Sequence, residues 1–326
     1  MMSRVANADR PVRPVTSFDK RAHAFHAALT CFNRIRLSPA LPDPHWESSL
    51  RGQMAWLREE RLFIERERAA IQARAALAPL GVAGFMAWFE DLRNCGPGQG
   101  DPLFPWLAEE ADLDQMRWFL RQEAAGEAGF DDLVALTQVR LPARPKLEMA
   151  RNYWDEMGRG HEAGMHGRLL ARTVNDLQLR PSVESTVWES LALANLMAGL
   201  ASNRCYAYHA LGALGVIEMT APGRVALVNA GMKRLALPSS TRLYFQLHAG
   251  LDLKHSLDWN REVIMPLVAS DPAIAIAVAE GALMRLAAGA RCFRRYRLQF
   301  RVGAAAPAAR DRSGASARLV TSRISV

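Results

Sequence analysis

Apolar residues recur along this chain every three or four positions, which is the spacing of amphipathic helices. The alternation of apolar and polar residues that marks strands is almost absent. The pattern therefore predicts an all-α helical bundle. Beyond a first helical region at about 20–95, it predicts helices near 109–127, 130–138, 146–157, 161–176, 182–202, 203–219, 222–233, 240–257, 259–269 and 271–298.

Proline and capping residues suggest where several of these helices begin. Pro181-Ser182, Ala221-Pro222, Pro238-Ser239-Ser240 and Asp271-Pro272 all have the composition of helix starts. The strongest break is 94–105, which has three glycines and three prolines in twelve residues. We therefore expect a flexible leader (1–20), an N-terminal helical extension (21–100), a main helical domain (101–300) and a flexible basic tail (301–326).

The chain has 326 residues, of which half are hydrophobic, 41 are basic and 33 are acidic. Its excess of positive charge is confined to one end. The segment from Arg291 to Val326 holds nine arginines and one acid, Asp311, which leaves 32 basic and 32 acidic residues for the rest. A nucleic-acid-binding domain needs positive charge on its folded surface, so this distribution favours a solvated tail and predicts no nucleic-acid partner.

Cysteine usage and targeting signals are those of a cytoplasmic protein. The four cysteines are far apart and form no C-x-x-C motif, which argues against a zinc site or a disulfide framework. The first residues lack the apolar region of a signal peptide, and no uninterrupted apolar run reaches the roughly 18 residues of a membrane span. The sequence also lacks Walker motifs, G-x-G-x-x-G and the nucleophile elbow, which disfavours the common enzyme classes that carry them.

The most informative motif is H-x3-D-x2-H, formed by His248, Asp252 and His255. At about 100° per residue these three side chains fall within roughly 60° of one another on a helix. Two imidazoles and a carboxylate on one face suit iron, manganese or zinc, and helical bundles build such sites from facing helices. The alternative is a surface hydrogen bond between His and Asp one turn apart.

Further metal ligands would have to come from other helices. Glu218 ends an almost uncharged helical stretch, where a buried carboxylate would need a metal or another partner, although an exposed helix end is the alternative. The segment 152–167 offers Glu156, His161, Glu162 and His166 among several glycines. Glu123 follows an apolar helical run and could project inward or face solvent.

Taken in order, these elements resemble the haem-oxygenase-like diiron oxidases and oxygenases, often described as iron-containing redox enzymes. The motif at 248–255 is similar to that family's last metal-binding helix, and Glu218 corresponds to the Glu about thirty residues earlier. The D-E-x-G-x-G stretch followed by His corresponds to Glu156 and His166, and the earlier helical Glu corresponds to Glu123. The resemblance covers about 110–297.

The resemblance implies a seven-helix-like bundle that holds two iron ions with His and carboxylate ligands and uses O2 as co-substrate. It implies that Glu156 bridges the irons or supports their ligands. Some relatives carry another carboxylate three residues before the second-element His, where this chain has Ala163, and Glu156 or Glu162 are candidate substitutes. The implied ligand set is Glu123, Glu156, His166, Glu218, His248, Asp252 and His255.

The implied substrate is a small organic molecule such as an amine, amino acid or fatty acid, with an external electron donor as a further partner. Arg204 and His209 could meet an anionic substrate group or cap a helix. Aromatic side chains at helical spacing are more often core than pocket. The candidates for a pocket lining are Tyr153, Trp154, Trp188, Tyr206, Tyr208, Tyr244, Phe245 and Trp259.

Two other hypotheses stay open at the level of sequence. The chain could be a haem-binding or cofactor-independent member of the same fold. It could also be a metal-free helical interaction protein that uses the 20–95 helices and the basic tail, and a homodimer is compatible with any of these readings.

Overall fold

The computed structural model describes residues 16–126 and 129–303, except for the side chains of residues 126 and 251–254. The described residues form helices and no strand, which confirms the all-α prediction. The α-helices are α1 (Ser17–Leu37), α2 (Trp46–Ala75), α3 (Val82–Cys95), α4 (Leu103–Glu109), α5 (Leu113–Gly126), α6 (Phe130–Thr137), α7 (Ala143–Glu156), α8 (His166–Asp176), α9 (Trp188–Ser202), α10 (Ala207–Arg234), α11 (Leu243–Asp258), α12 (Met265–Ser270) and α13 (Ala273–Phe300). Short 3-10 turns lie at Gly158–Gly160, Glu162–Gly164 and Arg204–Tyr206, and a π-helical turn lies at Trp259–Ile264.

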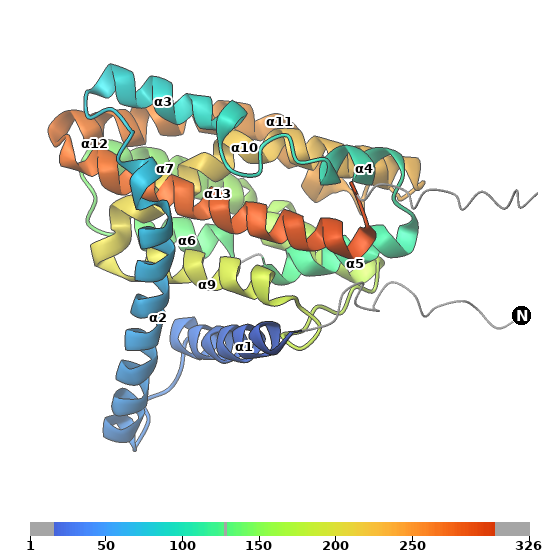
Figure 1. Cartoon of the computed structure of the whole chain (residues 1–326), viewed down its shortest axis with the longest axis horizontal. Coiled ribbons are helices and arrows are strands. Elements are labelled where there is room, and N and C mark those ends of the chain that lie inside the picture. Colours follow the sequence, from blue (N-terminus) through green and yellow to red (C-terminus); the bar gives the residue numbers. More distant parts are fainter. Residues whose placement is uncertain (1–15, 127–128, 304–326) are drawn as a thin grey trace, which may run out of the picture.

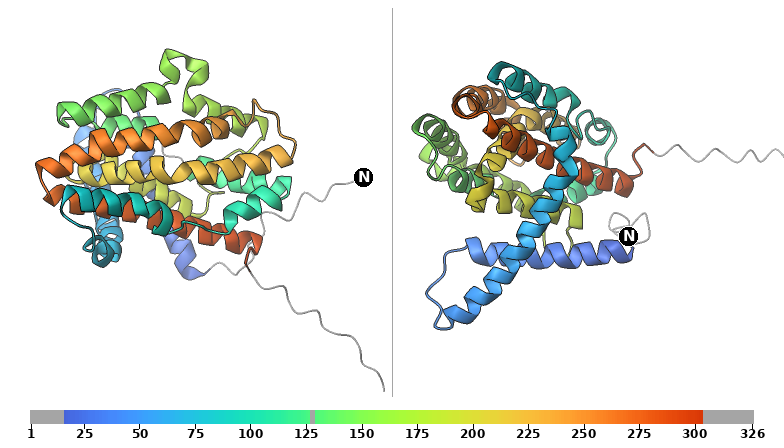
Figure 2. Two further views of the ribbon diagram at one scale, coloured as in Figure 1. Left: turned by 90° about the horizontal axis from the view of Figure 1, so that it is seen from above. Right: turned by 60° about the vertical axis from the view of Figure 1, so that its left-hand side comes forward.

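Helix α10 lies at the centre of the bundle, between α11 and α13 (Figure 2). It also packs against α4, while α9 lies across its start and contacts α1, α5 and α6 (Figure 1). Because α10 and α13 are almost wholly apolar over their buried lengths, they supply a large part of the shared core. This arrangement leaves α7, α8 and α11 to enclose the remaining face.

The N-terminal helices share this core. Leu29 of α1 and Ile64 of α2 are fully buried and belong to one hydrophobic cluster with Leu211 and Val278. Helix α2 crosses the bundle steeply, and its first half extends beyond it (Figures 1 and 2). The extension expected at 21–100 is therefore built into the same body as the main domain.

The backbones of α10 and α13 touch where glycines face the partner helix. A Cβ on Gly212 would lie 2.0 Å from the carbonyl oxygen of Val278, and a Cβ on Gly281 would lie 1.9 Å from that of His209. Only residues without a side chain permit this approach. The close packing fixes the position of α10, which carries Glu218 at its middle.

Gly212→Ala is expected to destabilise the fold by about 3 kcal/mol, because backbone atoms of Val278 cannot move aside as a side chain would. Gly223→Ala on the same helix is the control. No atom lies within 4 Å of the Cβ it would gain, so this change is expected to be neutral or to stabilise by about 0.5–1 kcal/mol. Urea unfolding of both variants measures the difference, and equal midpoints would contradict the close-packing account.

One helix boundary expected from proline is wrong. Pro222 lies inside α10, which continues unbroken from Ala207 to Arg234, so 203–219 and 222–233 are not separate helices. Proline removes the hydrogen bond that the Glu218 carbonyl would otherwise accept. Packing of α10 against α4, α11 and α13 on both sides of Pro222 keeps the helix continuous, although an interior proline costs about 3 kcal/mol of helix stability.

Two other helices begin later than expected. Helix α9 starts at Trp188 rather than near 182, because the Ser182, Ser185 and Thr186 hydroxyls bond within a local turn. Helix α8 starts at His166 rather than near 161, after the two 3-10 turns. The expected break at 94–105 is confirmed, since it joins α3 to α4 and includes Gly98 and Gly100 at positive φ.

Two helical segments, Arg204–Arg234 and Ala273–Phe300, are long and apolar enough to span a membrane. The search for uninterrupted apolar runs missed them. Within the bundle, 61% and 67% of their most apolar windows are buried. Such burial is typical of the core helices of a soluble protein.

The basic C-terminal stretch is partly used in ion pairs of the folded domain. Arg291 pairs with Glu67 of α2 at 2.9 Å, and Arg297 pairs with Asp101 at 3.1 Å. Residues 1–15 of the expected leader and 304–326 of the expected tail lie outside the described part of the chain.

Candidate metal centre

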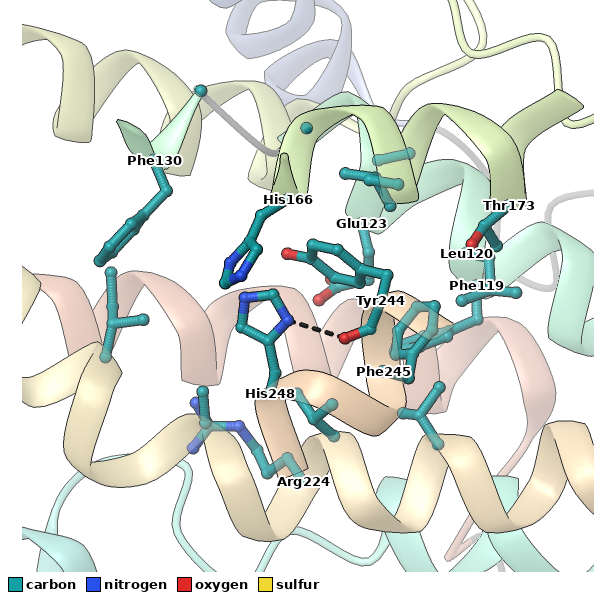
Figure 3. A pocket seen from close by; sticks show the side chains of 18 of the residues that line it. Phe119, Leu120, Glu123, Phe130, His166, Thr173, Arg224, Tyr244, Phe245 and His248 are labelled. Atoms are coloured by element: carbon teal, nitrogen blue, oxygen red, sulfur yellow. Dashed lines mark hydrogen bonds between the residues drawn. The ribbon is translucent and has the colours of Figure 1, made fainter. Parts of the chain in front are cut away.

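Three of the expected ligands meet between α7, α8 and α11. Glu156 ends α7, His166 begins α8 and His248 lies on α11. One ligand atom from each lies within 4.8 Å of the other two, and Glu156 Oε2 and His166 Nδ1 are 2.7 Å apart. Among the side chains that the structure describes, this is the one group of three metal-ligating residues so close together. Figure 3 shows His166 and His248 facing each other.

The loop between α7 and α8 brings Glu156 and His166 together. Gly158 has a φ of +61°, and a Cβ on it would lie 2.4 Å from the backbone carbon of Gly164. The chain therefore folds back tightly enough to return His166 to the end of α7, and only glycine fits at position 158. The glycines of the D-E-x-G-x-G stretch thus serve to join two ligands.

The ring of His248 is held in one orientation. Its Nδ1 lies 2.8 Å from the Tyr244 carbonyl oxygen and donates to it, which leaves Nε2 without a proton and able to bind a metal. The ring also packs against Tyr244 and His166, at centroid distances of 4.2 and 4.6 Å. Burial lowers the pKa of His248 to about 4, so the imidazole is neutral at pH 7.

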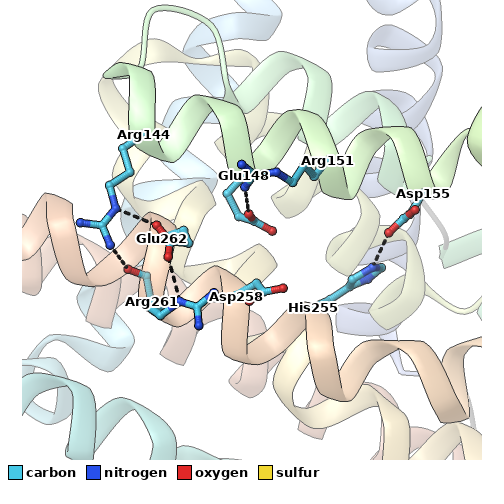
Figure 4. A network of polar contacts seen from close by, with 8 residues as sticks. All are labelled: Arg144, Glu148, Arg151, Asp155, His255, Asp258, Arg261 and Glu262. Carbon is cyan, nitrogen blue, oxygen red and sulfur yellow. Dashed lines mark hydrogen bonds and ion pairs between the residues drawn. The ribbon is translucent and has the colours of Figure 1, made fainter.

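Two more of the expected ligands form a second pair beside this group. His255 Nδ1 lies 3.8 Å from Glu218 Oε2, and both side chains are buried. His255 Nε2 lies 3.0 Å from Asp155 Oδ2, and Asn152 donates to Glu218 Oε1 at 2.8 Å (Figure 4 for the His255 contact). Each ligand is therefore positioned by a neighbour on α7.

Burial strongly perturbs the two glutamates. It raises the pKa of Glu156 to about 8 and that of Glu218 to about 7. In the metal-free protein Glu156 consequently keeps its proton at pH 7, and Glu218 is about half protonated there. Perturbed acids of this kind cluster at functional sites, where a cation or a reaction makes use of them.

A cavity of about 190 Å³ opens onto these side chains (Figure 3). Glu156, His166, Glu218 and His248 line one part of it. Most of the remaining lining is apolar, with Phe104, Phe119, Phe245 and Phe293 among its larger side chains. The candidate ligands are therefore accessible to a small molecule inside an otherwise closed bundle.

Glu123 is not a member of the three-residue ligand group. Glu123 lines the cavity, but its Oε1 accepts a hydrogen bond from the Tyr296 hydroxyl at 2.9 Å. Burial raises its pKa, while Arg285 and Arg224 act in the opposite direction. Its assignment as a metal ligand stays a prediction that this placement does not support.

The structure treats the remaining candidate ligands and substrate-binding residues differently. Asp252 lies on α11, but its side chain is outside the described part. Glu162 is exposed and pairs with Arg168 at 2.8 Å, so it does not replace the carboxylate missing at Ala163. Arg204 donates to the carbonyls of Leu136, Thr137 and Val139 and thus caps a helix end.

Of the aromatic candidates, Tyr244 and Phe245 line the cavity, whereas Trp259 is core. His209 pairs with Glu280 at 2.9 Å rather than facing the cavity. Sequence reasoning missed Asp155 and Asn152 as supports for His255 and Glu218. Their place on α7, three residues apart and just before Glu156, is the signal that could have found them.

Comparison with known proteins identifies the family. The sequence profile of the iron-containing redox enzymes matches residues 117–290, a little over half of the chain. The chain belongs to this family. No curated protein matches it at a significant level.

Two crystal structures of a CADD-like protein of unknown function from Nostoc punctiforme are similar to the chain. One is 17% identical, with a TM-score of 0.44, and the match covers 75% of this chain and 98% of that one. The other is 16% identical, with a TM-score of 0.46, and the match covers 77% and 100%.

The residues of this iron-containing redox enzyme fit a metal centre. The Nδ1 atom of His255 is buried and has no hydrogen-bond partner among the described residues, although an unmet polar atom in the interior is costly. His166 Nδ1 lies against the Glu156 carboxyl, at 2.7 Å. Two ligand atoms that are each about 2.1 Å from one ion lie at most about 4.2 Å apart. The ligand atoms of Glu156, His166 and His248 lie within 4.8 Å of one another, so small side-chain shifts would bring all three to one ion. Imidazole and carboxylate together suit iron.

Asp155→Asn is expected to weaken iron binding by about 10–100-fold, because an amide holds the orientation of His255 less well than a carboxylate. Anaerobic competition between the protein and a chromophoric Fe(II) chelator measures the affinity. Asp258→Asn is the control, since Asp258 pairs with Arg261 on the same face and contacts no candidate ligand (Figure 4). Equal loss of affinity in both variants would show that general destabilisation is responsible.

Proposed function

We propose that this protein is a non-haem diiron oxidase or oxygenase that uses O2 to oxidise a small organic substrate. The observation that carries the proposal is the buried group of Glu156, His166 and His248 beside the pair of Glu218 and His255. The buried His255 Nδ1, which has no hydrogen-bond partner among the described residues, points to a bound cation rather than to a structural hydrogen-bond network. Membership of the iron-containing family supports iron as the cation.

Glu156, His166 and His248 would hold one iron. Glu218 and His255 would hold the second, together with Asp252, whose assignment rests on the sequence. Bound ferrous iron supplies electrons and open coordination positions for reducing O2. Complete reduction of O2 to water takes four electrons, of which two ferrous ions give two, so the substrate or an external donor supplies the rest.

The protein's own groups prepare and protect this chemistry. The Tyr244 carbonyl keeps His248 in the tautomer that can bind a metal, and Asp155 orients His255. The aromatic lining of the cavity limits water beside the centre. Glu156 and Glu218 release protons when they bind a cation, since without one Glu156 is protonated at pH 7 and Glu218 is about half protonated there.

An anaerobic Fe(II) titration followed by mixing with O2 tests the proposal. We expect two Fe(II) per chain and an oxygen-dependent absorbance change in stopped flow. A chain that takes up no iron, or whose bound iron is inert to O2, would overturn it. Parallel titrations with Mn(II) and Zn(II) are needed because divalent-metal affinities overlap.

The cavity size argues against the haem-binding alternative. Pockets for drug-sized ligands have volumes of roughly 300–1,000 Å³, whereas this cavity has about 190 Å³. A haem is larger than most drugs. A small substrate beside two ions fits the space better.

An interaction role is the second candidate function, and one observation favours it. Trp46, Leu50 and Met54 recur at four-residue intervals on the protruding half of α2, and all three are exposed. Molecular mass in solution tests for a homodimer.

Cytoplasmic location, absence of a nucleic-acid partner and use of an external electron donor are further parts of our proposal.

A further inference from the structure

The cavity has a second wall that carries charge, formed by α4, α10 and α13. Arg224 of α10 and Arg285 of α13 line it beside Phe104 and Phe293. Two guanidinium groups in a largely apolar cavity are costly to desolvate unless anions compensate them. The candidate metal ligands lie on α7, α8, the middle of α10 and α11. They therefore belong to the other wall of the cavity.

Arg224 has only weak, uncharged partners. Its guanidinium donates to Gln99 Oε1 at 3.4 Å and to Thr220 Oγ1 at 3.3 Å, both long for such bonds. It lies over the rings of Phe293 and Phe104, at 5.5 and 5.8 Å from their centroids. Within the described residues no carboxylate oxygen comes within 4.0 Å of it, so the rings fix its place while its charge stays uncompensated by an ion pair.

Among the described residues, no acid of the cavity lining forms an ion pair with Arg224. The charge of Glu123 acts on Arg224, but its Oε1 accepts from Tyr296 and burial raises its pKa. The other acid of the lining outside the ligand set, Asp131, acts electrostatically on Glu156 and His166 instead. Burial lowers the pKa of Arg224 to about 10, in part because Arg285 is close. Arg224 is therefore a buried cation that an anion inside the cavity would stabilise.

We propose that Arg224 binds the carboxylate of a small apolar substrate, with the body of that substrate lying in the cavity. This inference rests on the proposed function, whose substrate class it names. The planar guanidinium matches a carboxylate in charge and geometry. A single guanidinium without an ion pair suits a monoanion better than a phosphate dianion.

The cavity also limits the size of the substrate. A cavity of about 150 Å³ is known to take a benzene ring, so about 190 Å³ accommodates a phenyl group or a chain of roughly six to eight carbons. Arg224 follows Glu218 by six residues, which is about 9 Å along the axis of α10. With its carboxylate at Arg224, the substrate presents a carbon of its body, rather than the carboxylate, to the metal centre.

Calorimetric titration of the metal-free full-length protein tests the proposal, because a carboxylate cannot then bind through iron. The probes are octanoate and 4-phenylbutyrate, each compared with the matching primary amide, and inorganic phosphate. We expect at least one carboxylate to bind the wild type at least about ten-fold more tightly than its amide. We expect Arg224→Gln to lose this preference and Arg224→Lys to retain part of it.

Arg261→Gln is the matched control, because Arg261 is exposed and pairs with Asp258 and Glu262 away from the cavity. Thermal unfolding of each variant checks that it folds, and Arg224→Lys keeps the test valid if Arg224→Gln does not. The proposal is overturned if neither carboxylate binds, if amides or phosphate bind as tightly, or if octanoate binds Arg224→Gln as it binds the wild type. Carboxylate selectivity without iron uptake would sink the proposed function alone, whereas two oxygen-reactive irons without that selectivity would sink only this inference.

Discussion

His248→Ala is expected to abolish oxygen-dependent turnover and to reduce the bound iron from two ions per chain to one or none. His248 supplies the imidazole that faces both His166 and the cavity, with Nε2 left open by the bond from Nδ1 to Tyr244. Loss of a group that merely supports a ligand costs about 10–100-fold in metal affinity or activity, so loss of a ligand is expected to cost more than about 100-fold. Iron analysis and oxygen consumption measure the two effects.

His45→Ala is the control for this variant, because His45 is exposed and makes no side-chain cap on α2. It is expected to keep wild-type iron content and oxygen consumption. Added imidazole is expected to restore part of the iron binding of His248→Ala by filling the space of the lost ring. Full iron content and activity in His248→Ala would remove this histidine from the metal centre.

The second large effect concerns pH. Without metal, deprotonation of two buried carboxyls is expected to cost about 2 kcal/mol of stability as the pH rises from 6.5 to 8. In the folded state Glu156 and Glu218 have pKa values of about 8 and 7, whereas an unfolded glutamate titrates near 4.5. Above pH 6.5 these two groups therefore hold more protons in the folded than in the unfolded state, and their contribution to stability falls until the folded pKa is passed.

Four buried histidines oppose this effect. Burial lowers the folded pKa of His26, His166, His209 and His248, whereas an unfolded histidine titrates near 6.5. Between pH 6.5 and 8 each of them therefore adds about 0.4 kcal/mol of stability as the unfolded chain loses its proton. The difference between the wild type and Glu156→Gln, which share these histidines, reports on the carboxyl.

Urea unfolding of the EDTA-treated protein at pH 6.5 and 8 measures the change. Glu156→Gln is expected to remove about 1.6 kcal/mol of the loss, because an amide does not titrate, whereas Glu262→Gln on the surface is expected to behave as the wild type. Anaerobic Fe(II) should make stability rise with pH, since metal binding requires deprotonated ligands and strengthens with pH. The same pH profile in the metal-free wild type and Glu156→Gln would contradict the buried, protonated carboxyl.

Much of the candidate centre was predictable because part of it is local. His248 and His255 share one face of α11 by helix geometry alone, and the structure places both beside other expected ligands. The buried position of Glu218 also followed from its apolar neighbours. These predictions needed only the helical period and the cost of burying a charge.

Other features depend on which surfaces meet. Pro222 signals a helix start, yet packing of α10 on three helices carries the helix through it. Glu123 has the local pattern of an inward-facing ligand, but α13 brings the Tyr296 hydroxyl to its carboxylate. Asp155 directly precedes Glu156 in the sequence, but it becomes a support for His255 only because α7 lies against α11.

The sequence by itself determined that this protein is helical, that it belongs to the iron-containing redox enzymes, and that His248 and His255 lie on one face of a helix. Helical period and apolar spacing are local properties, so nearby residues suffice to read them. The tertiary structure alone decided that a glycine loop joins Glu156 to His166 and that Asp155 and Asn152 hold the second ligand pair. It also decided that Arg224 faces the cavity with no ion-pair partner among the described residues. These features arise from contacts between helices far apart in the chain, where packing and desolvation determine which polar groups find partners.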